Sequence, residues 1–275
     1  MNAYFIKIIG FYINLISHFS SIYAAKLAIK LFSTPQKGRL NEKENLYLDS
    51  AIQEEIIHKN ISIKTYCWKG EKETILLAHG WESNAYRWKS FIEILKPLNY
   101  TIIALDAPGH GNSSGKLFNA ILYSECIHAV AKKFKANTIV GHSVGGTATI
   151  FSQYKKQLAS IEKIVLLGAP ADFVGVFERY ETMMGYNKKV SHAMAQYVLR
   201  ELNHLPAYYS APDFIKEIEA KILAVHDKKD RIIPYTDGLK FKKNYEKVEF
   251  IGTKGFGHGL KNETVHNHVI DFLNA

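Results

Sequence analysis

The middle of the chain carries the segment Gly141-His142-Ser143-Val144-Gly145-Gly146, in which a serine has one glycine two positions before it and another two positions after it. The apolar run Thr138–Val140 before this segment predicts a short buried strand, and the pattern of residues 145–155 predicts a helix. Such a turn strains the serine backbone, and bulky neighbours at its glycine positions would clash. It also presents the hydroxyl near a helix N-terminus, which stabilises negative charge. The turn therefore predicts Ser143 as a nucleophile; the alternative is a glycine-rich turn with an incidental serine.

Strand patterns and helix patterns alternate along most of the chain. Strands are predicted at residues 61–68, 74–78, 101–105, 138–140, 164–167 and 222–225, with a further strand-like run at 248–251. Helices are predicted at residues 85–95, 120–134, 145–155, 236–244 and 263–273. This alternation favours a parallel sheet covered on both faces. Residues 171–212 break it: they are rich in aromatic residues and methionine, have no buried-strand run, and predict a helical insertion over one end of the sheet.

A serine hydroxyl at neutral pH needs a general base, and His258 is the candidate. It lies in Gly257-His258-Gly259, between the last strand-like run and the last helix. Flanking glycines allow a loop to bring the imidazole against a serine on another loop. The chain has 12 histidines, so the alternative is a surface histidine without a catalytic role.

The base needs a carboxylate that fixes its tautomer and stabilises the imidazolium, and Asp230 is the first candidate. It follows directly after the buried run at residues 222–225. Asp227, three residues earlier, and Asp172, after another strand end, are the alternatives. The predicted chain order Ser143, Asp230, His258 differs from the orders in chymotrypsin and in subtilisin.

A tetrahedral intermediate also needs hydrogen-bond donors for its oxyanion. The backbone N–H of Val144, directly after the serine, is one candidate. The second is the N–H of Trp81 in His79-Gly80-Trp81, which follows the run at residues 74–78. Gly80 allows this loop to come close, and we interpret His79 as a structural hydrogen-bonding residue rather than as a second base.

Taken together, these segments resemble the α/β-hydrolase superfamily, over about residues 60 to 275. The matching pieces are His79-Gly80-Trp81, the loop from Asp106 to Ser113, the Ser143 turn, Asp230 with Ile233-Pro234, and Gly257-His258. The resemblance implies a mostly parallel eight-stranded sheet flanked by helices, with a small helical cap inserted after the sixth strand at residues 171–212. It also implies a structural role for the 106–113 loop. Asp227 departs from the pattern, because relatives usually carry glycine there.

The resemblance implies a serine hydrolase, carboxylesterase-like, acting on an ester, thioester or amide of a small acyl substrate through a Ser-His-Asp triad and an acyl-enzyme. It implies no metal and no organic cofactor. An acyltransferase or a C–C bond hydrolase with the same triad is the alternative among enzymes, since the cap sets the substrate. A hydrolase-fold protein that binds without turnover is the alternative outside enzymes.

Composition adds limits on partners and compartment. The formal net charge is +9, but only five of the 35 basic residues are arginine and no compact basic run occurs, so we expect no nucleic-acid partner. Cys67 and Cys126 are interpreted as small buried hydrophobic residues, which suits a reducing compartment such as the cytoplasm.

The first 45 residues are predicted to form a helical extension and a linker, preceding a catalytic domain at residues 46–275. Residues 3–32 are mostly apolar, residues 1–40 contain no acidic residue, and Pro35 ends the helix. Small or polar residues recur at helical spacing, at Lys7, Gly10, Asn14, Ser17, Ser21, Ala25 and Ala28. Three interpretations stay open: packing on the body of the protein, contact of residues 1–33 with an anionic membrane surface, or a signal peptide or transmembrane anchor.

Overall fold

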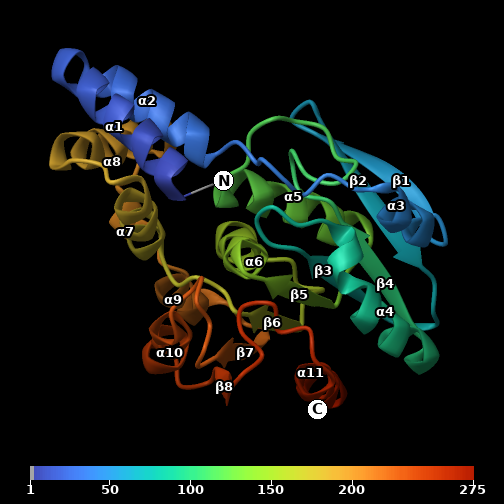
Figure 1. Cartoon of the computed structure of the whole chain (residues 1–275). Coiled ribbons are helices and arrows are strands. Elements are labelled where there is room, and N and C mark those ends of the chain that lie inside the picture. The colour runs from blue at the N-terminus through green and yellow to red at the C-terminus, as the bar shows by residue number, and fades with distance from the viewer. Residues whose placement is uncertain (1–2) are drawn as a thin grey trace. The chain divides into compact units, whose positions relative to one another are not determined.

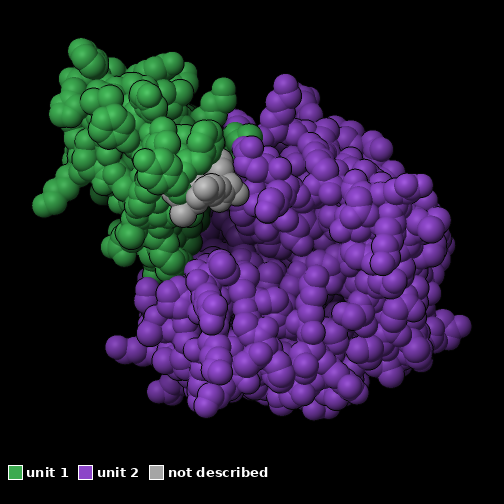
Figure 2. Space-filling model, viewed as in Figure 1, with its two compact units in different colours: residues 1–34, 172–210 green, residues 35–171, 211–275 purple. Residues whose placement is uncertain are grey.

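The computed structural model describes residues 3–275, and the chain divides into two compact units (Figure 2). Unit 1 combines residues 1–34, described from residue 3 onward, with residues 172–210. Unit 2 contains residues 35–171 and 211–275. The N-terminal helices and the segment predicted as an insertion therefore belong to one compact unit, although about 140 residues separate them in the sequence.

Unit 2 is built on one sheet, which contains eight strands within residues 3–275, in the order β1-β2-β4-β3-β5-β6-β7-β8. β2 runs antiparallel to β1 and to β4, and all other neighbours are parallel. The strands are β1 (Ile52–His58), β2 (Ile61–Trp68), β3 (Lys72–Ala78), β4 (Tyr100–Leu105), β5 (Thr138–His142), β6 (Lys163–Leu167), β7 (Lys221–Asp227) and β8 (Glu249–Thr253). The predicted architecture, a mostly parallel eight-stranded sheet flanked by helices, is confirmed.

The sequence patterns predict every strand of this sheet except β1. β1 is an edge strand that pairs only with β2, and Gln53, Glu54 and Glu55 occupy its middle. Ile52 and Ile57 in the same strand are exposed. A strand with little burial on either face shows neither an apolar run nor a clean alternation, which explains why the pattern missed it.

Helices cover both faces of the sheet (Figure 1). α4 (Lys89–Leu95) and α11 (Glu263–Asn274) lie on one face, and α5 (Ala120–Lys133), α6 (Val144–Lys155) and α10 (Tyr235–Asn244) lie on the other. Two short helices complete the unit, α3 (Glu42–Leu48) and α9 (Ala211–Phe214). α3 begins inside the predicted linker, where Asn41 and Glu44 form a capping box. The core under α4 and α11 includes Ile75, Leu77, Phe91, Ile92, Val225, Val265 and Val269.

Unit 1 consists of four helices within the described residues: α1 (Ala3–Phe19), α2 (Ser21–Phe32), α7 (Phe173–Met184) and α8 (Lys188–Leu202). The single N-terminal helix predicted from the sequence is broken at Ser20, whose side chain accepts a hydrogen bond from the amide of Tyr23 at 3.2 Å. α1 and α2 pack along α7 and α8 around a small core that includes Ile13, Ala24, Ala28, Tyr180, Val190 and Met194. Among residues 3–275, no helix has both the length and the apolar character needed to cross a membrane.

Candidate active site

Ser143 lies on the turn between β5 and α6, in a backbone conformation that non-glycine residues rarely adopt. Its φ is 53° and its ψ is −130°, and its amide donates to the carbonyl of Leu167 at 2.8 Å. The glycines beside it are needed for packing. A Cβ at Gly141 would lie 2.5 Å from the Cα of Gly146, and a Cβ at Gly145 would lie 2.4 Å from the carbonyl oxygen of Ala78. The sequence thus folds into a tight, strained turn that holds the hydroxyl at the carboxyl edge of the sheet.

Three side chains predicted from the sequence meet at this edge. The Oγ atom of Ser143 lies 3.0 Å from Nε2 of His258, and Nδ1 of His258 lies 2.7 Å from Oδ2 of Asp230. Because an ionised carboxylate only accepts, the Nδ1–H of His258 donates to Asp230, which leaves Nε2 free to accept the serine proton. Each residue follows a different parallel strand, β5, β7 or β8. Parallel strands bring their carboxyl ends to one edge, which is why residues 115 positions apart come into contact.

The Asp230 side chain is fully buried and is held as a carboxylate. Burial acts to raise the pKa of Asp230, but hydrogen bonds from His258 and from two backbone amides outweigh it, so that the pKa lies below its ordinary value. The two amides are those of Ile232 and Ile233, which donate to Oδ1 at 2.8 and 2.9 Å. One oxygen is therefore fixed by the turn, and the other faces the imidazole.

The two alternative acids have other contacts. The carboxylate of Asp227 accepts hydrogen bonds from the Thr253 hydroxyl and from the amides of Lys229, Gly255 and Phe256. Burial opposes ionisation there, but these donors outweigh it and lower the pKa of Asp227 to about 2. Asp227 thus joins the end of β7 to the loop that carries His258. Asp172 caps α7 by accepting from the amide of Gly175 at 2.7 Å.

The loop after β3 approaches the nucleophile closely. A Cβ at Gly80 would lie 2.8 Å from Cβ of Ser143, so only glycine fits at this position without displacement of the turn that carries Ser143. Trp81 follows it, and its ring packs against His110 and Phe118, with ring centroids 5.6 and 5.2 Å away. Val144 is the first residue of α6, and the first amides of a helix have no acceptor within the helix. The backbone amides of Trp81 and Val144 thus lie on two segments that meet at Ser143.

His79 and the 106–113 loop form a buried polar support beneath the site. Nε2 of His79 accepts from the amide of Ala107 at 2.9 Å, and burial keeps the pKa of His79 well below its ordinary value. Asp106 accepts from the Ala85 amide, from the Tyr66 hydroxyl and from the Asn112 amide, at 2.8, 2.8 and 2.9 Å. These contacts fit the structural roles expected from the sequence.

Two side chains that sequence reasoning missed hold the His258 loop. His142 donates from Nε2 to the carbonyl of His258 at 2.8 Å, and burial lowers the pKa of His142 far enough to keep it neutral. Arg87 donates to the carbonyl of Gly259 at 2.9 Å. Burial lowers the pKa of Arg87 to about 9, so it still carries its charge at neutral pH. His142 stands next to the nucleophile in the sequence and could have been suspected, whereas no pattern marks Arg87.

Within residues 3–275, no group of three or more His, Cys, Asp or Glu side chains is arranged so that it could hold a metal ion. Cys67 and Cys126 are free and buried.

Comparisons with known proteins agree with this fold. A family model described as "Alpha/beta hydrolase family" matches residues 75–252, well over half of the chain. The chain is 22% identical over 250 residues to the AB hydrolase superfamily protein YisY of Bacillus subtilis, covering 75% of this chain and 93% of that protein. It is 33% identical over 100 residues to a serine hydrolase-like protein of Danio rerio, covering 34% of this chain but only 30% of that protein. The solved structure of mouse alpha/beta hydrolase domain-containing protein 10 superposes with a TM-score of 0.63 at 16% identity, covering 82% of this chain and 97% of that one.

Proposed function

The chain belongs to the alpha/beta hydrolase family, and on that premise we propose that it is a serine hydrolase that cleaves a carboxylic ester through Ser143, His258 and Asp230. The observation that carries the proposal is the unbroken chain of hydrogen bonds from the serine Oγ to the imidazole and on to the buried carboxylate, at 3.0 and 2.7 Å. A protein that only binds a ligand would have no need for a strained serine aligned with a base and an orienting acid.

The proposed reaction follows from the roles of these groups. His258 removes the hydroxyl proton of Ser143 as the oxygen attacks the ester carbonyl, and Asp230 stabilises the imidazolium. The amides of Trp81 and Val144 donate to the resulting oxyanion. When the intermediate collapses, His258 gives its proton to the departing alcohol and an acyl-enzyme is formed.

The second half of the reaction repeats these steps with water. His258 takes a proton from a water molecule that attacks the acyl carbonyl, and the amides of Trp81 and Val144 again hold the oxyanion. Collapse breaks the bond to Ser143, which recovers its proton from His258, and the carboxylic acid is released. The net change is one ester and one water converted to one acid and one alcohol, so this route needs no cofactor.

Turnover of a graded substrate panel tests this proposal. We expect hydrolysis of p-nitrophenyl esters of increasing chain length, with acyl-CoA thioesters assayed alongside to separate ester from thioester preference. Ser143→Ala should lower kcat by roughly 10⁶-fold, as removal of a triad serine does. No hydrolysis of any ester or thioester, or equal turnover by the variant, would contradict the proposal. Transfer of the acyl group to added alcohols in preference to water would identify an acyltransferase instead.

We extend the proposal to the compartment and suggest the cytoplasm. The two free, buried thiols of Cys67 and Cys126 support this, because reduced cysteines of this kind suit a reducing environment.

A further inference from the structure

The two N-terminal helices turn their small and polar residues toward the rest of unit 1. The stripe consists of Gly10, Asn14 and Ser17 on α1 and of Ala25 and Ala28 on α2. A Cβ at Gly10 would lie 1.8 Å from the carbonyl oxygen of Met184, so the glycine permits α1 to lie directly against the end of α7. The two alanines of α2 are fully buried. The stripe is therefore the packing seam of unit 1.

Hydrogen bonds fix α1 in this orientation. Nδ2 of Asn14 donates to the carbonyl of Gly185 at 2.8 Å, and Oδ1 of Asn14 accepts from the amide of Asn187 at 2.9 Å. Nearer the N-terminal end of α1, Nζ of Lys7 donates to the carbonyl of Thr182 at 2.7 Å. Both polar ends of Asn14 are thus used by the α7–α8 connection, and rotation of α1 about its axis would break these bonds.

The opposite side of α1 is apolar and exposed. Its exposed apolar residues recur three or four positions apart, as one face of a helix requires, and this apolar set continues into the first turn of α2. We call this set the outer face: Phe5, Ile8, Phe11, Tyr12, Leu15, Phe19, Ile22 and Tyr23. Phe11 is 59% exposed and Phe19 is 94% exposed. The inner side of α1 also carries apolar residues, because Ile9, Ile13 and Ile16 pack in the core of unit 1, so the helix is apolar on both sides. A helix that only packs on a protein body normally has a polar outer side, and an exposed apolar face of this kind marks a binding site.

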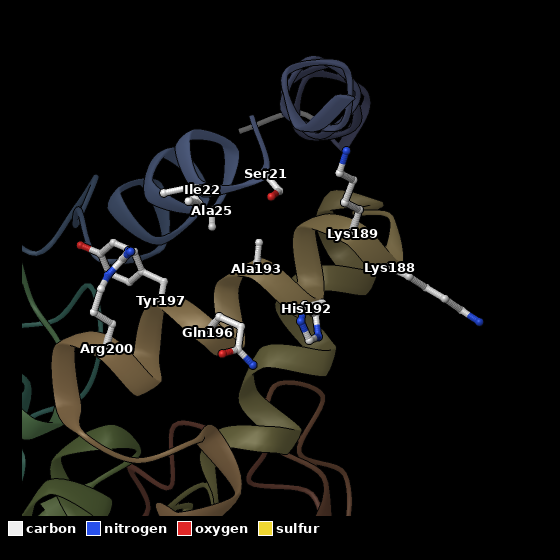
Figure 3. Close-up of a pocket in the computed structure, with 10 residues that line it drawn as sticks. All are labelled: Ser21, Ile22, Ala25, Lys188, Lys189, His192, Ala193, Gln196, Tyr197 and Arg200. Carbon is white, nitrogen blue, oxygen red and sulfur yellow. The ribbon is translucent and has the colours of Figure 1, made fainter. Parts of the chain in front are cut away.

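The charge around the outer face is cationic. Lys26 and Lys30 lie exposed on α2, and no Asp or Glu occurs in residues 1–40. Beside Ile22, an open groove runs between α2 and α8, and its rim carries Lys188, Lys189 and Arg200 (Figure 3).

We propose that the outer face binds an anionic lipid surface, with its aromatic and aliphatic side chains at the acyl boundary and the neighbouring lysines against the headgroups. The charges decide the occupant. Two copies of this face would bring lysines together with no acid from either helix to pair with them, whereas anionic headgroups neutralise them. The Tyr12 ring, with its hydroxyl, is of the type favoured at the boundary between water and lipid, and Phe11 and Phe19 are typical of the apolar face of helices that lie in this boundary. This inference goes beyond the proposed hydrolysis and does not depend on it.

Flotation of the full chain with vesicles tests the proposal. We expect binding to vesicles of phosphatidylcholine mixed with phosphatidylglycerol, weaker binding to phosphatidylcholine alone, and a decrease with added salt. The double variant Phe11→Ser/Leu15→Ser should weaken binding at least tenfold. Lys26→Gln and Lys30→Gln should each weaken binding to the anionic vesicles by roughly fivefold. Ile57→Ser, at an exposed apolar position in β1 of unit 2, is the matched control and should leave binding unchanged.

Fluorescence provides a second measurement that does not rely on loss of binding. In Phe11→Trp, lipids brominated on their acyl chains should quench the added emission, whereas Ile57→Trp should show no added quenching. Absence of binding by the wild type, or equal binding by the Phe11→Ser/Leu15→Ser variant, would overturn the proposal. A wild-type dimer in solution that fails to bind vesicles, and that this double variant converts to a monomer, would assign the face to a second copy and would also overturn it.

Discussion

Both units of the chain bury polar side chains, but the two sets differ in kind. At the sheet edge of unit 2 the buried groups can ionise, and they act on one another: Asp230 contacts His258, and His258 contacts a serine with a positive φ. In unit 1 the polar groups that hold the helices together are the half-buried Asn14 and the buried Ser17, which carry no charge and are hydrogen-bonded within the helices and the turn that pack together.

This difference indicates which properties of a polar residue point to a reaction and which point to packing. Hydrogen bonds to neighbouring groups are common to both sets, so this property does not separate them. Backbone strain and a row of coupled titratable groups occur only in the first set, and these are the properties that a reaction needs. Asn14 instead has the properties of a packing residue: it is neutral, it is hydrogen-bonded at both its oxygen and its nitrogen, and it lies near the close approach that Gly10 permits.

Replacing Asp230, the acid at the sheet edge of unit 2, should give the largest effect, a loss of turnover. Asp230→Asn keeps the shape of the side chain but no longer holds His258 in the tautomer that can accept the serine proton, so kcat for a p-nitrophenyl ester should fall by roughly 10⁴-fold. Asp227→Asn is the matched control, because Asp227 binds loop amides and the Thr253 hydroxyl. It should lower kcat by less than about tenfold and act mainly on thermal stability.

Comparison of the Asp230→Asn and Asp227→Asn variants decides which carboxylate is the catalytic acid. Near-normal turnover by Asp230→Asn together with a severe loss in Asp227→Asn would move the catalytic carboxylate to Asp227. Both variants should be assayed at a temperature where circular dichroism shows that they are folded.

Breaking the seam of unit 1 should give an intermediate effect, on stability. Asn14→Ala removes two hydrogen bonds to the α7–α8 connection and should cost about 1–3 kcal/mol of local stability. Leu15→Ala, one position along and on the outer face, should change stability by no more than about 0.5 kcal/mol. Hydrogen exchange should accelerate in α1 and α7 for the first variant only. Equal effects of the two substitutions would mean that the exposed side, and not the polar stripe, holds α1.

A further effect is expected on the pH dependence of folding stability. Burial lowers the pKa of His110 to about 4, and its Nε2 accepts a hydrogen bond from the Glu82 amide. The unfolded chain binds this proton below about pH 6.5 and the folded chain does not, so folding stability should fall as the pH drops from about 6.5 to 4.

His110→Gln tests this contribution. The variant should lose less stability over this pH range than the wild type, by up to about 1.4 kcal/mol per pH unit, in urea unfolding. Burial raises the pKa of Asp106 to about 6, which gives the opposite trend, but Asp106 is present in both proteins and cancels in the difference. Parallel pH profiles would show that His110 does not titrate differently on folding.

Much of unit 2 could be predicted because its signals are local. Apolar runs locate the buried strands, and Ser143, Asp230 and His258 each follow a strand end, so a parallel sheet brings them to one edge. β1 was missed because an exposed edge strand has no pattern. Arg87 could not be found because its role depends on a backbone carbonyl 172 positions away.

The N-terminal helices could be predicted only in part, for a different reason. Helical spacing reveals a polar stripe and an apolar stripe, but it does not say which of them faces the protein. In a helix on a protein body the outer side is expected to be polar, whereas in α1 Phe11 faces out although Ile13 packs inward beside Gly10 and Asn14. The partner helices α7 and α8, far away in the sequence, decide the orientation.

The central claim is that Ser143 is a nucleophile activated by His258 and Asp230, and covalent trapping tests it most directly. The wild-type chain, treated with a fluorophosphonate probe and analysed by mass spectrometry, should carry one adduct, located on Ser143. Ser143→Ala should remain unlabelled, and His258→Ala should react far more slowly because the hydroxyl has lost its base. A Ser143→Ala variant that labels as fast as the wild type would contradict the account.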